Sequence, residues 1–118
     1  MTPDEIIDAY IDAFEKMDRD AILGLIAPGA VIWHNFDEVD RDIASSLSEL
    51  HRMKDMLDGM HYELIERFAI KDGIGARLVL RGVRRATGEA FASHQAKFFH
   101  IRDGKVFRIE EYVAPPRS

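Results

Sequence analysis

Cysteine is absent from this chain of 118 residues. Without it the protein cannot form disulfides, thiolate metal sites or a cysteine nucleophile, and the composition fits a reducing compartment. We therefore expect a cytoplasmic protein. Residues 1–5 lack the basic start and apolar run of a signal peptide, and no apolar segment approaches the roughly 18 residues that a membrane span needs. We expect neither export nor a membrane partner.

Positive charge is also in short supply, with 16 lysines and arginines against 21 aspartates and glutamates and a formal net charge of −5. A nucleic-acid-binding surface would need a concentrated basic face, so we expect no nucleic-acid partner. Four arginines do gather on one predicted strand, at Arg77, Arg81, Arg84 and Arg85. Such a run is usually a solvated surface or one that faces a protein partner.

Short motifs of nucleotide and metal sites are missing as well. Gly73-Ile74-Gly75 has neither the third glycine nor the following helix of a dinucleotide-binding fingerprint. The acidic loop at 37–42 lacks the glycine and terminal glutamate of an EF-hand. His94 and His100 share one strand face without a nearby carboxylate pattern, which is a weak basis for zinc. The sequence predicts no cofactor and no metal.

Length and composition are those of one globular domain spanning residues 1–118. The chain is 47% hydrophobic and 31% charged, well away from the composition of disordered segments. A chain of this length supports one continuous core rather than two. The last residues, 115–118, are expected to be extended and poorly ordered.

Helical signals fill the first half of the chain. Residues 2–5 read Thr-Pro-Asp-Glu, in which threonine caps a helix, proline takes its first position and glutamate closes a capping box. A second, short helix follows the Asp18 cap and ends at Pro28-Gly29. A third runs from the acidic loop to Gly59.

The second half of the chain changes to a period of two, which is typical of strands. The predicted strands are His61–Ile70, Ile74–Arg85, Phe91–Ile101 and Val106–Val113, besides an earlier strand at 30–35. Turns that contain glycine separate the four later strands, so we expect an antiparallel meander.

Three helices before a long antiparallel sheet predict an α+β fold, in which curved strands wrap around the first helix and leave a cavity. The outer face of the sheet mixes Arg77, Arg81 and Arg85 with Val79 and Val83. That mixture suits a homodimer interface, and a solvent-exposed sheet is the alternative.

Much of the chain resembles the SnoaL-like branch of the nuclear transport factor 2-like superfamily and, more distantly, the ketosteroid isomerases. The similar stretches are Tyr10–Phe14, Asp18–Ile22, Ala30–Asn35, Asp103–Val106 and Ile109–Val113. The resemblance covers almost the whole chain. It implies a cone-shaped fold, with three N-terminal helices packed in a curved antiparallel sheet, and a homodimer.

Two residues of this chain fall on catalytic positions of the isomerases. Aligned without a gap, Tyr10 falls on their oxyanion-hole tyrosine and His34 on their general-base aspartate. In ketosteroid isomerase, a tyrosine and a protonated aspartate polarise a carbonyl while a second aspartate moves the proton. Here the base position holds a histidine, and the strand that would supply the protonated aspartate offers Ala96 or Lys97. The resemblance therefore implies a related pocket rather than steroid isomerisation.

Glu111 is the candidate partner of His34. An imidazole titrates near neutral pH and can take or return a proton. Glu111 shares a strand side with Ile109 and Val113, and a carboxylate among apolar residues is costly unless it is paired. A contact with His34 would satisfy Glu111 and hold the imidazole tautomer. The alternative is that Tyr10 and His34 are ordinary core residues and that Glu111 faces solvent.

Further side chains are expected to contact a ligand in the same cavity: Phe14, Trp33, Asn35, Phe68, Lys97, Phe99 and Ile109. Trp33 and Asn35 have the opposite strand parity from His34, so without a bulge only one set can face the cavity. The resemblance places His34 inward. Glu66 shares the parity of Phe68, but an ion pair with an arginine of the next strand is its favoured role.

Two hypotheses follow. The first is a SnoaL-like small-molecule pocket protein that binds an apolar, carbonyl-bearing metabolite. In it Tyr10 would donate to an oxygen and His34 would transfer a proton, as in an isomerase, cyclase or hydratase. The second is a noncatalytic ligand-binding or dimerisation module whose cavity is filled by Phe14, Trp33 and Phe68.

Overall fold

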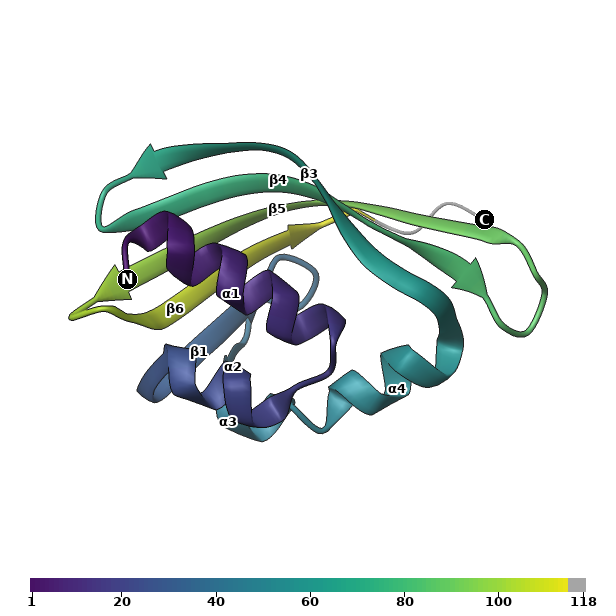
Figure 1. Cartoon of the computed structure of the whole chain (residues 1–118), viewed down its shortest axis with the longest axis horizontal. Helices are drawn as coiled ribbons and strands as arrows, with labels where there is room; N and C mark the ends of the chain where they lie inside the picture. The colour runs from purple at the N-terminus through teal and green to yellow at the C-terminus, as the bar shows by residue number, and fades with distance from the viewer. Residues whose placement is uncertain (115–118) are drawn as a thin grey trace.

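A curved sheet of six strands arches over the helices, which all lie on its concave side (Figure 1). The computed structural model describes residues 1–114 of the chain. In chain order the elements are α1 (Pro3–Glu15), α2 (Arg19–Leu25), β1 (Ile26–His34), β2 (Asp40–Asp42), α3 (Ile43–Ser46), α4 (Glu49–Met56), β3 (Leu57–Ile70), β4 (Gly73–Arg84), β5 (Ala90–Arg102) and β6 (Lys105–Val113). The predicted α+β class is confirmed. The tail at 115–118, expected to be extended, lies outside the described residues, and no helix among the rest is long and apolar enough to cross a bilayer.

The strands are ordered β2-β1-β6-β5-β4-β3 across the sheet. β3 to β6 form the predicted antiparallel meander. β1 joins β6 in parallel, and the short β2 pairs with the other edge of β1. The sheet is therefore mixed rather than wholly antiparallel. A parallel pair needs a long crossover, and here the chain from β2 to β5 supplies it.

Helix starts follow the sequence signals closely. Thr2 and Glu5 form the predicted capping box, in which each side chain accepts a hydrogen bond from the other residue's backbone N–H. Asp18 caps α2 by accepting from the backbone of Ala21. Asp42 of the acidic loop caps α3 in the same way, through the N–H of Ser45.

Helix ends depart from the predicted positions. The third predicted helix is broken into α3 and α4. Pro28-Gly29 lies inside β1, at a register shift between Ile26 and Val31, because α2 has already ended. Gly59 lies inside β3 with a φ of +63°, next to another register shift. Both glycines therefore mark strand irregularities, a role glycine also has.

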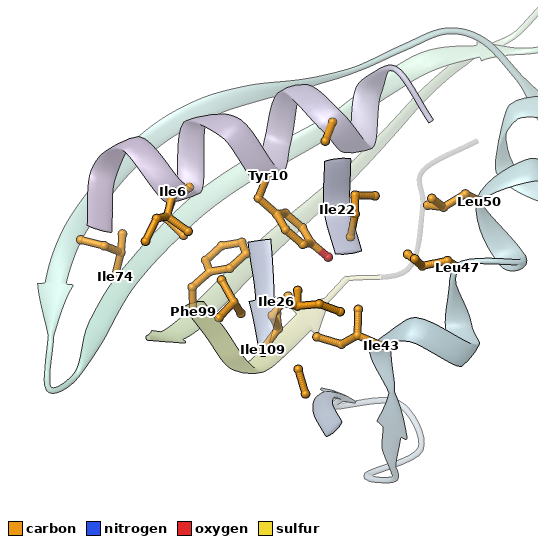
Figure 2. Packing of buried hydrophobic residues seen from close by; sticks show 14 residues of the cluster. Ile6, Tyr10, Ile22, Ile26, Ile43, Leu47, Leu50, Ile74, Phe99 and Ile109 are labelled. Carbon is orange, nitrogen blue, oxygen red and sulfur yellow. The ribbon is translucent and has the colours of Figure 1, made fainter. Parts of the chain in front are cut away.

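The core lies between α1 and the concave face of the sheet, and Figure 2 shows its side chains converging there. Phe99 of β5 is fully buried and packs edge-on against Tyr10 of α1, with ring centroids 5.5 Å apart. Ion pairs hold the N-terminal half of α1 to β3. Arg67 of β3 reaches Asp4 at 3.1 Å and Asp8 at 2.6 Å.

A bulge in β3 reverses the direction of its side chains. Leu64 pairs with Leu78 and Glu66 with Arg77, so β3 carries one extra residue, Ile65, at this point. A one-residue slip moves every later side chain to the other face. Phe68, which shares sequence parity with the inward Tyr62, consequently faces outward.

The outer face of the sheet carries a row of four aromatic rings, which we call the aromatic row: Trp33, Tyr112, Phe98 and Phe68. Neighbouring ring centroids are 5.4, 5.9 and 6.2 Å apart along it. The row crosses β4 at Gly75, where a Cβ atom would lie 2.2 Å from the Phe68 ring. Glycine is needed there because any side chain would displace that ring.

Two arginines of β4 and Arg85, which directly follows this strand, are paired with acidic residues of β3. Arg77 contacts Glu66 at 2.6 Å, which confirms the predicted ion pair of Glu66. The other pairs are Arg81 with Glu63 at 3.2 Å and Arg85 with Asp58 at 2.8 Å. Since these pairs are solvated, each contributes only about 0–1 kcal/mol to stability.

Candidate active site

A cavity of about 970 Å³ lies between the concave face of the sheet and the helices. The apolar part of its wall comes mainly from the helices, and its members include Phe14, Ile43, Leu47, Leu50 and Met53. The polar groups that matter for chemistry come from α1 and the strands: Tyr10, His34, Tyr62, Gln95, Lys97 and Glu111. A cavity of this size that is mostly apolar, with a few convergent polar groups, is typical of small-molecule sites.

Lys97 and Glu111 form a buried ion pair on neighbouring strands, with Nζ 3.1 Å from Oε2. They are register partners of β5 and β6, so their side chains leave the same face side by side. Burial favours the neutral carboxylic acid, but the Lys97 ammonium and the nearby His34 outweigh it and lower the pKa of Glu111 to about 2. Burial likewise opposes the ammonium, yet Glu111 raises the pKa of Lys97. Both groups are therefore charged at neutral pH.

His34 lies at the end of β1, next to Glu111. The parallel register pairs the two residues, and the N–H of Asn35 donates to the Glu111 carbonyl at 3.0 Å to hold this end of β1 against β6. His34 Nε2 is 3.5 Å from Glu111 Oε1, longer than a good hydrogen bond. Its ring lies against Phe36 with centroids 4.8 Å apart. Its Nδ1 is buried and, within residues 1–114, has no hydrogen-bond partner.

Tyr62 was not singled out from the sequence, although it is central to the polar wall. Lys97 Nζ donates to its phenolic oxygen at 2.8 Å, and the ammonium lies 4.5 Å from the Tyr62 ring centroid. Its backbone N–H donates to Glu15 at 2.7 Å, which ties β3 to the end of α1. Burial raises the pKa of Tyr62, so its phenol stays protonated at neutral pH.

Tyr10 projects from α1 into the same region. Figure 2 shows its hydroxyl directed toward the helical side that carries Ile43 and Leu47, and all three residues line the cavity. Burial raises the pKa of Tyr10, so this phenol is a neutral donor as well. The structure thus brings the predicted Tyr10, His34 and Glu111 to one cavity, together with Phe14 and Lys97.

Five of the expected ligand contacts lie elsewhere, which corrects their predicted position. Trp33 and Phe68 belong to the aromatic row on the outer face. Asn35 also points outward, and its side-chain oxygen accepts from the N–H of Val113 at 2.8 Å. Phe99 and Ile109 face inward but are fully buried in the core, next to the cavity rather than at its surface.

The histidines of β5 do not form a metal site with each other. His100 Nε2 lies 2.7 Å from Glu110 Oε1 and packs on Phe107. Across residues 1–114 no three histidine, aspartate or glutamate side chains gather closely enough to hold a metal ion.

Comparison with known proteins assigns the chain to a family. Residues 7–109 match the sequence profile of the SnoaL-like domain, and no curated protein sequence matches the chain.

Several solved structures have the same fold at low sequence identity. IdmH of Streptomyces antibioticus, a proposed polyketide cyclase, superimposes with a TM-score of 0.86 and 21% identity over 96% of this chain and 92% of its own. An NTF2-like protein of Burkholderia thailandensis gives 0.78 and 20% over 97% and 92%. A hypothetical protein of Catenulispora acidiphila with a ketosteroid isomerase-like fold gives 0.77 and 17% over 92% and 84%. At these identities the likeness establishes the fold.

Proposed function

The chain belongs to the SnoaL-like domain family, and from this premise we propose that its cavity binds an apolar, carbonyl-bearing metabolite and catalyses an acid–base reaction on it without a cofactor. The reaction types that suit a phenol donor beside a base are isomerisation, aldol-type cyclisation, and hydration or dehydration. The description of IdmH as a proposed polyketide cyclase agrees with a carbonyl-bearing ligand.

The observation that carries this proposal is the contact of His34 with the buried Glu111 on the cavity wall. In the proposed site the ionised Glu111 would accept from the N–H at Nε2, which would leave Nδ1 as the basic nitrogen. Such contacts often tighten only when a ligand is bound. Nδ1 is buried, so a ligand reaches it after a small local movement. Phe36, which is 66% exposed and packs against the imidazole, is the neighbour that we propose moves.

The role of Tyr10 is to donate to the ligand oxygen. Its hydroxyl points to the cavity and stays protonated at neutral pH, because burial raises the pKa of the phenol. A neutral donor in a largely apolar site stabilises charge as it develops on a carbonyl oxygen. Tyr10 would therefore polarise the carbonyl while His34 removes or returns the proton beside it.

The proposal is tested with His34→Ala and Tyr10→Phe. A panel of polycyclic ketones should contain ligands that raise the melting temperature of the unmodified chain. Each substitution should reduce the affinity for such a ligand by about tenfold, because one polar contact is worth roughly 1–1.5 kcal/mol. Any turnover of the same compound should be lost in His34→Ala. The measurements are thermal shift, calorimetry and product analysis.

Tyr112→Phe is the matched control, because Tyr112 lies on the outer face and is 46% exposed. Unchanged ligand stabilisation in both site variants would refute the proposed site. Binding without turnover of any bound compound would favour the noncatalytic alternative. That alternative predicted a cavity filled by Phe14, Trp33 and Phe68. The prediction is wrong for Trp33 and Phe68, which face outward and leave the cavity open.

We also propose that the aromatic row is the interface of a homodimer. Exposed apolar patches that carry aromatic side chains are typical of protein interfaces. Phe68 and Tyr112 are 38% and 46% exposed in the isolated chain, which leaves them available to a second copy. The ion pairs of β4 lie alongside and would form a polar rim.

Phe98→Glu should convert this dimer to a monomer. The substitution places a carboxylate in the middle of the row and opposite Glu110, its register partner, so two like charges would be buried together. Light scattering coupled to size-exclusion chromatography gives the mass directly. Leu23→Glu, on α2 and 40% exposed, is the control that should stay dimeric. A monomeric unmodified chain at high protein concentration would contradict the proposal.

A further inference from the structure

We infer that Tyr62, supported by Lys97, is a second hydrogen-bond donor to the ligand, and that the cavity prefers a ligand that carries an acidic hydroxyl in its ionised form, such as a phenolate or enolate. The inference builds on the proposed small-molecule function and names the chemical class that this wall of the cavity would select.

Tyr62 accepts one hydrogen bond and still has one to donate. An ammonium group has only donors, so at 2.8 Å the Lys97 Nζ donates and the phenolic oxygen of Tyr62 accepts. The phenol keeps its own O–H to donate. Within residues 1–114 this O–H has one hydrogen-bond acceptor, Gln95 Oε1, and at 3.5 Å it is a poor one. Because Tyr62 lines the cavity, this O–H is available to a ligand oxygen.

Lys97 strengthens the Tyr62 hydroxyl as a hydrogen-bond donor. A phenol that accepts a hydrogen bond from a cation becomes a stronger donor itself, since chains of hydrogen bonds polarise one another. Lys97 is only 5% exposed and is held from two sides, by Glu111 at 3.1 Å and by Tyr62. It therefore acts as a fixed charge behind the phenol rather than as a mobile surface lysine.

The Lys97 ammonium has one more N–H that it can donate. The ammonium has three N–H donors, of which Glu111 and Tyr62 take two. The third is left for the cavity, which Lys97 lines. A ligand oxygen placed between the Tyr62 hydroxyl and this N–H would receive two hydrogen bonds, one of them from a cation. Charged acceptors gain most from such an arrangement.

The preference for an anion comes from this local pair and not from the total charge of the cavity. The charged side chains on the wall are Arg41, Arg52, Lys97, Asp42, Glu49 and Glu111. Three are basic and three acidic, so they do not favour either sign. The apolar surroundings strengthen the local effect, because hydrogen bonds to charge are less screened there than in water.

Tyr62 and Tyr10 differ in this respect. Tyr10 packs against the apolar Phe99, whereas Tyr62 accepts directly from an ammonium. The two phenols are thus donors of unequal strength, and Tyr62 would bind the oxygen that carries the charge.

Two matched probes test the inference on the full chain. 4-Nitro-1-naphthol absorbs visible light when it is ionised, and 1-methyl-4-nitronaphthalene has a methyl group in place of the hydroxyl. At neutral pH the unmodified chain should bind the naphthol at least about tenfold more tightly than the methyl analogue, with the spectrum of the ionised form. Tyr62→Phe should remove about tenfold of that preference and leave the affinity for the methyl analogue unchanged.

The control is Tyr112→Phe, which makes the same chemical change on the outer face and should alter neither affinity. Circular dichroism shows whether Tyr62→Phe keeps its fold, which we expect because the backbone hydrogen bond to Glu15 does not involve the hydroxyl. Equal binding of the two probes, or a naphthol preference that survives Tyr62→Phe, would overturn the inference and leave the small-molecule site intact. Failure of both probes to bind would overturn the inference, whereas the proposed function is refuted separately, by the ketone panel and the His34→Ala and Tyr10→Phe variants.

Discussion

Lys97→Met should lower the free energy of unfolding by about 3–5 kcal/mol at pH 7, because it leaves the Glu111 carboxylate buried without its main counter-charge. The expected size follows from burial, since both side chains are more than nine-tenths covered. A solvated pair such as Arg77–Glu66 should lose only about 0–1 kcal/mol on the same kind of substitution.

The pH dependence of the free energy of unfolding gives a sharper test than the size of the loss at pH 7. In the unmodified chain the pKa of Glu111 is lowered to about 2 from an ordinary 4.5, so its contribution to stability is complete above pH 4.5 and is lost as pH falls toward 2. The pKa of Lys97 is raised, so its contribution is complete below its ordinary 10.5 and is lost progressively as pH rises from there toward the raised value. Between these limits the pair contributes a constant amount.

In Lys97→Met the change of stability with pH has the opposite sign. Without the ammonium, burial raises the pKa of Glu111, and folding then takes up a proton on Glu111. Stability should therefore fall as pH rises above the ordinary carboxyl pKa, by up to about 1.4 kcal/mol per pH unit. Urea unfolding at several pH values, followed by the fluorescence of the single tryptophan at fixed protein concentration, measures this slope.

The double variant Lys97→Met/Glu111→Leu is the control for the pair. It removes both charges and should recover most of the lost stability, because an apolar replacement of a buried ion pair is often neutral or better. If Lys97→Met kept the pH profile of the unmodified chain, Glu111 would not be the buried partner that the structure shows.

The second large effect is expected for Phe99→Ala, at about 3–5 kcal/mol of lost stability. Phe99 is fully buried and supports the Tyr10 ring from the sheet side. Its removal leaves a void that the surrounding core cannot close completely. A ligand contact at the cavity surface, which is the role expected from the sequence, would instead cost binding and little stability.

Phe91→Ala on the same strand is the matched control. Phe91 is partly exposed at the start of β5 and lies under the guanidinium of Arg84. We expect it to lose about 1 kcal/mol, since less apolar surface returns to water. Denaturant unfolding of the two variants compares them directly. Similar losses would show that Phe99 is not part of the core described above.

The sequence predicted the long strands, the first two helices and the inward direction of Lys97 and Glu111, but not β2 or the break between α3 and α4. Capping residues identified the helix starts, and strict alternation along β5 and β6 put Lys97 and Glu111 on one face. Parity alone did not show which part of that face a helix covers. Phe99 and Ile109 share the face of Glu111, but they lie where α1 packs, so they became core rather than cavity wall.

Other features depend on contacts between distant segments. The parallel pairing of β1 with β6 joins residues that are about 80 positions apart in the sequence, and no local pattern predicts it. The position of Tyr62 next to Lys97 likewise needs the register of β3 on β4 and of β4 on β5. For this reason the resemblance to a family indicated Tyr10, while Tyr62 emerged only from the assembled sheet.

The extra residue at Ile65 has a consequence for how relatives of this chain are compared. From His61 to Leu64, side chains with the parity of Tyr62 face the helices, and after Ile65 the opposite parity does, as Arg67 shows by reaching Asp4 and Asp8. A homologue with a one-residue deletion here would need its polar and apolar positions exchanged over the rest of the strand. Gap placement in an alignment at this point therefore decides which side chains are treated as equivalent across the last third of β3.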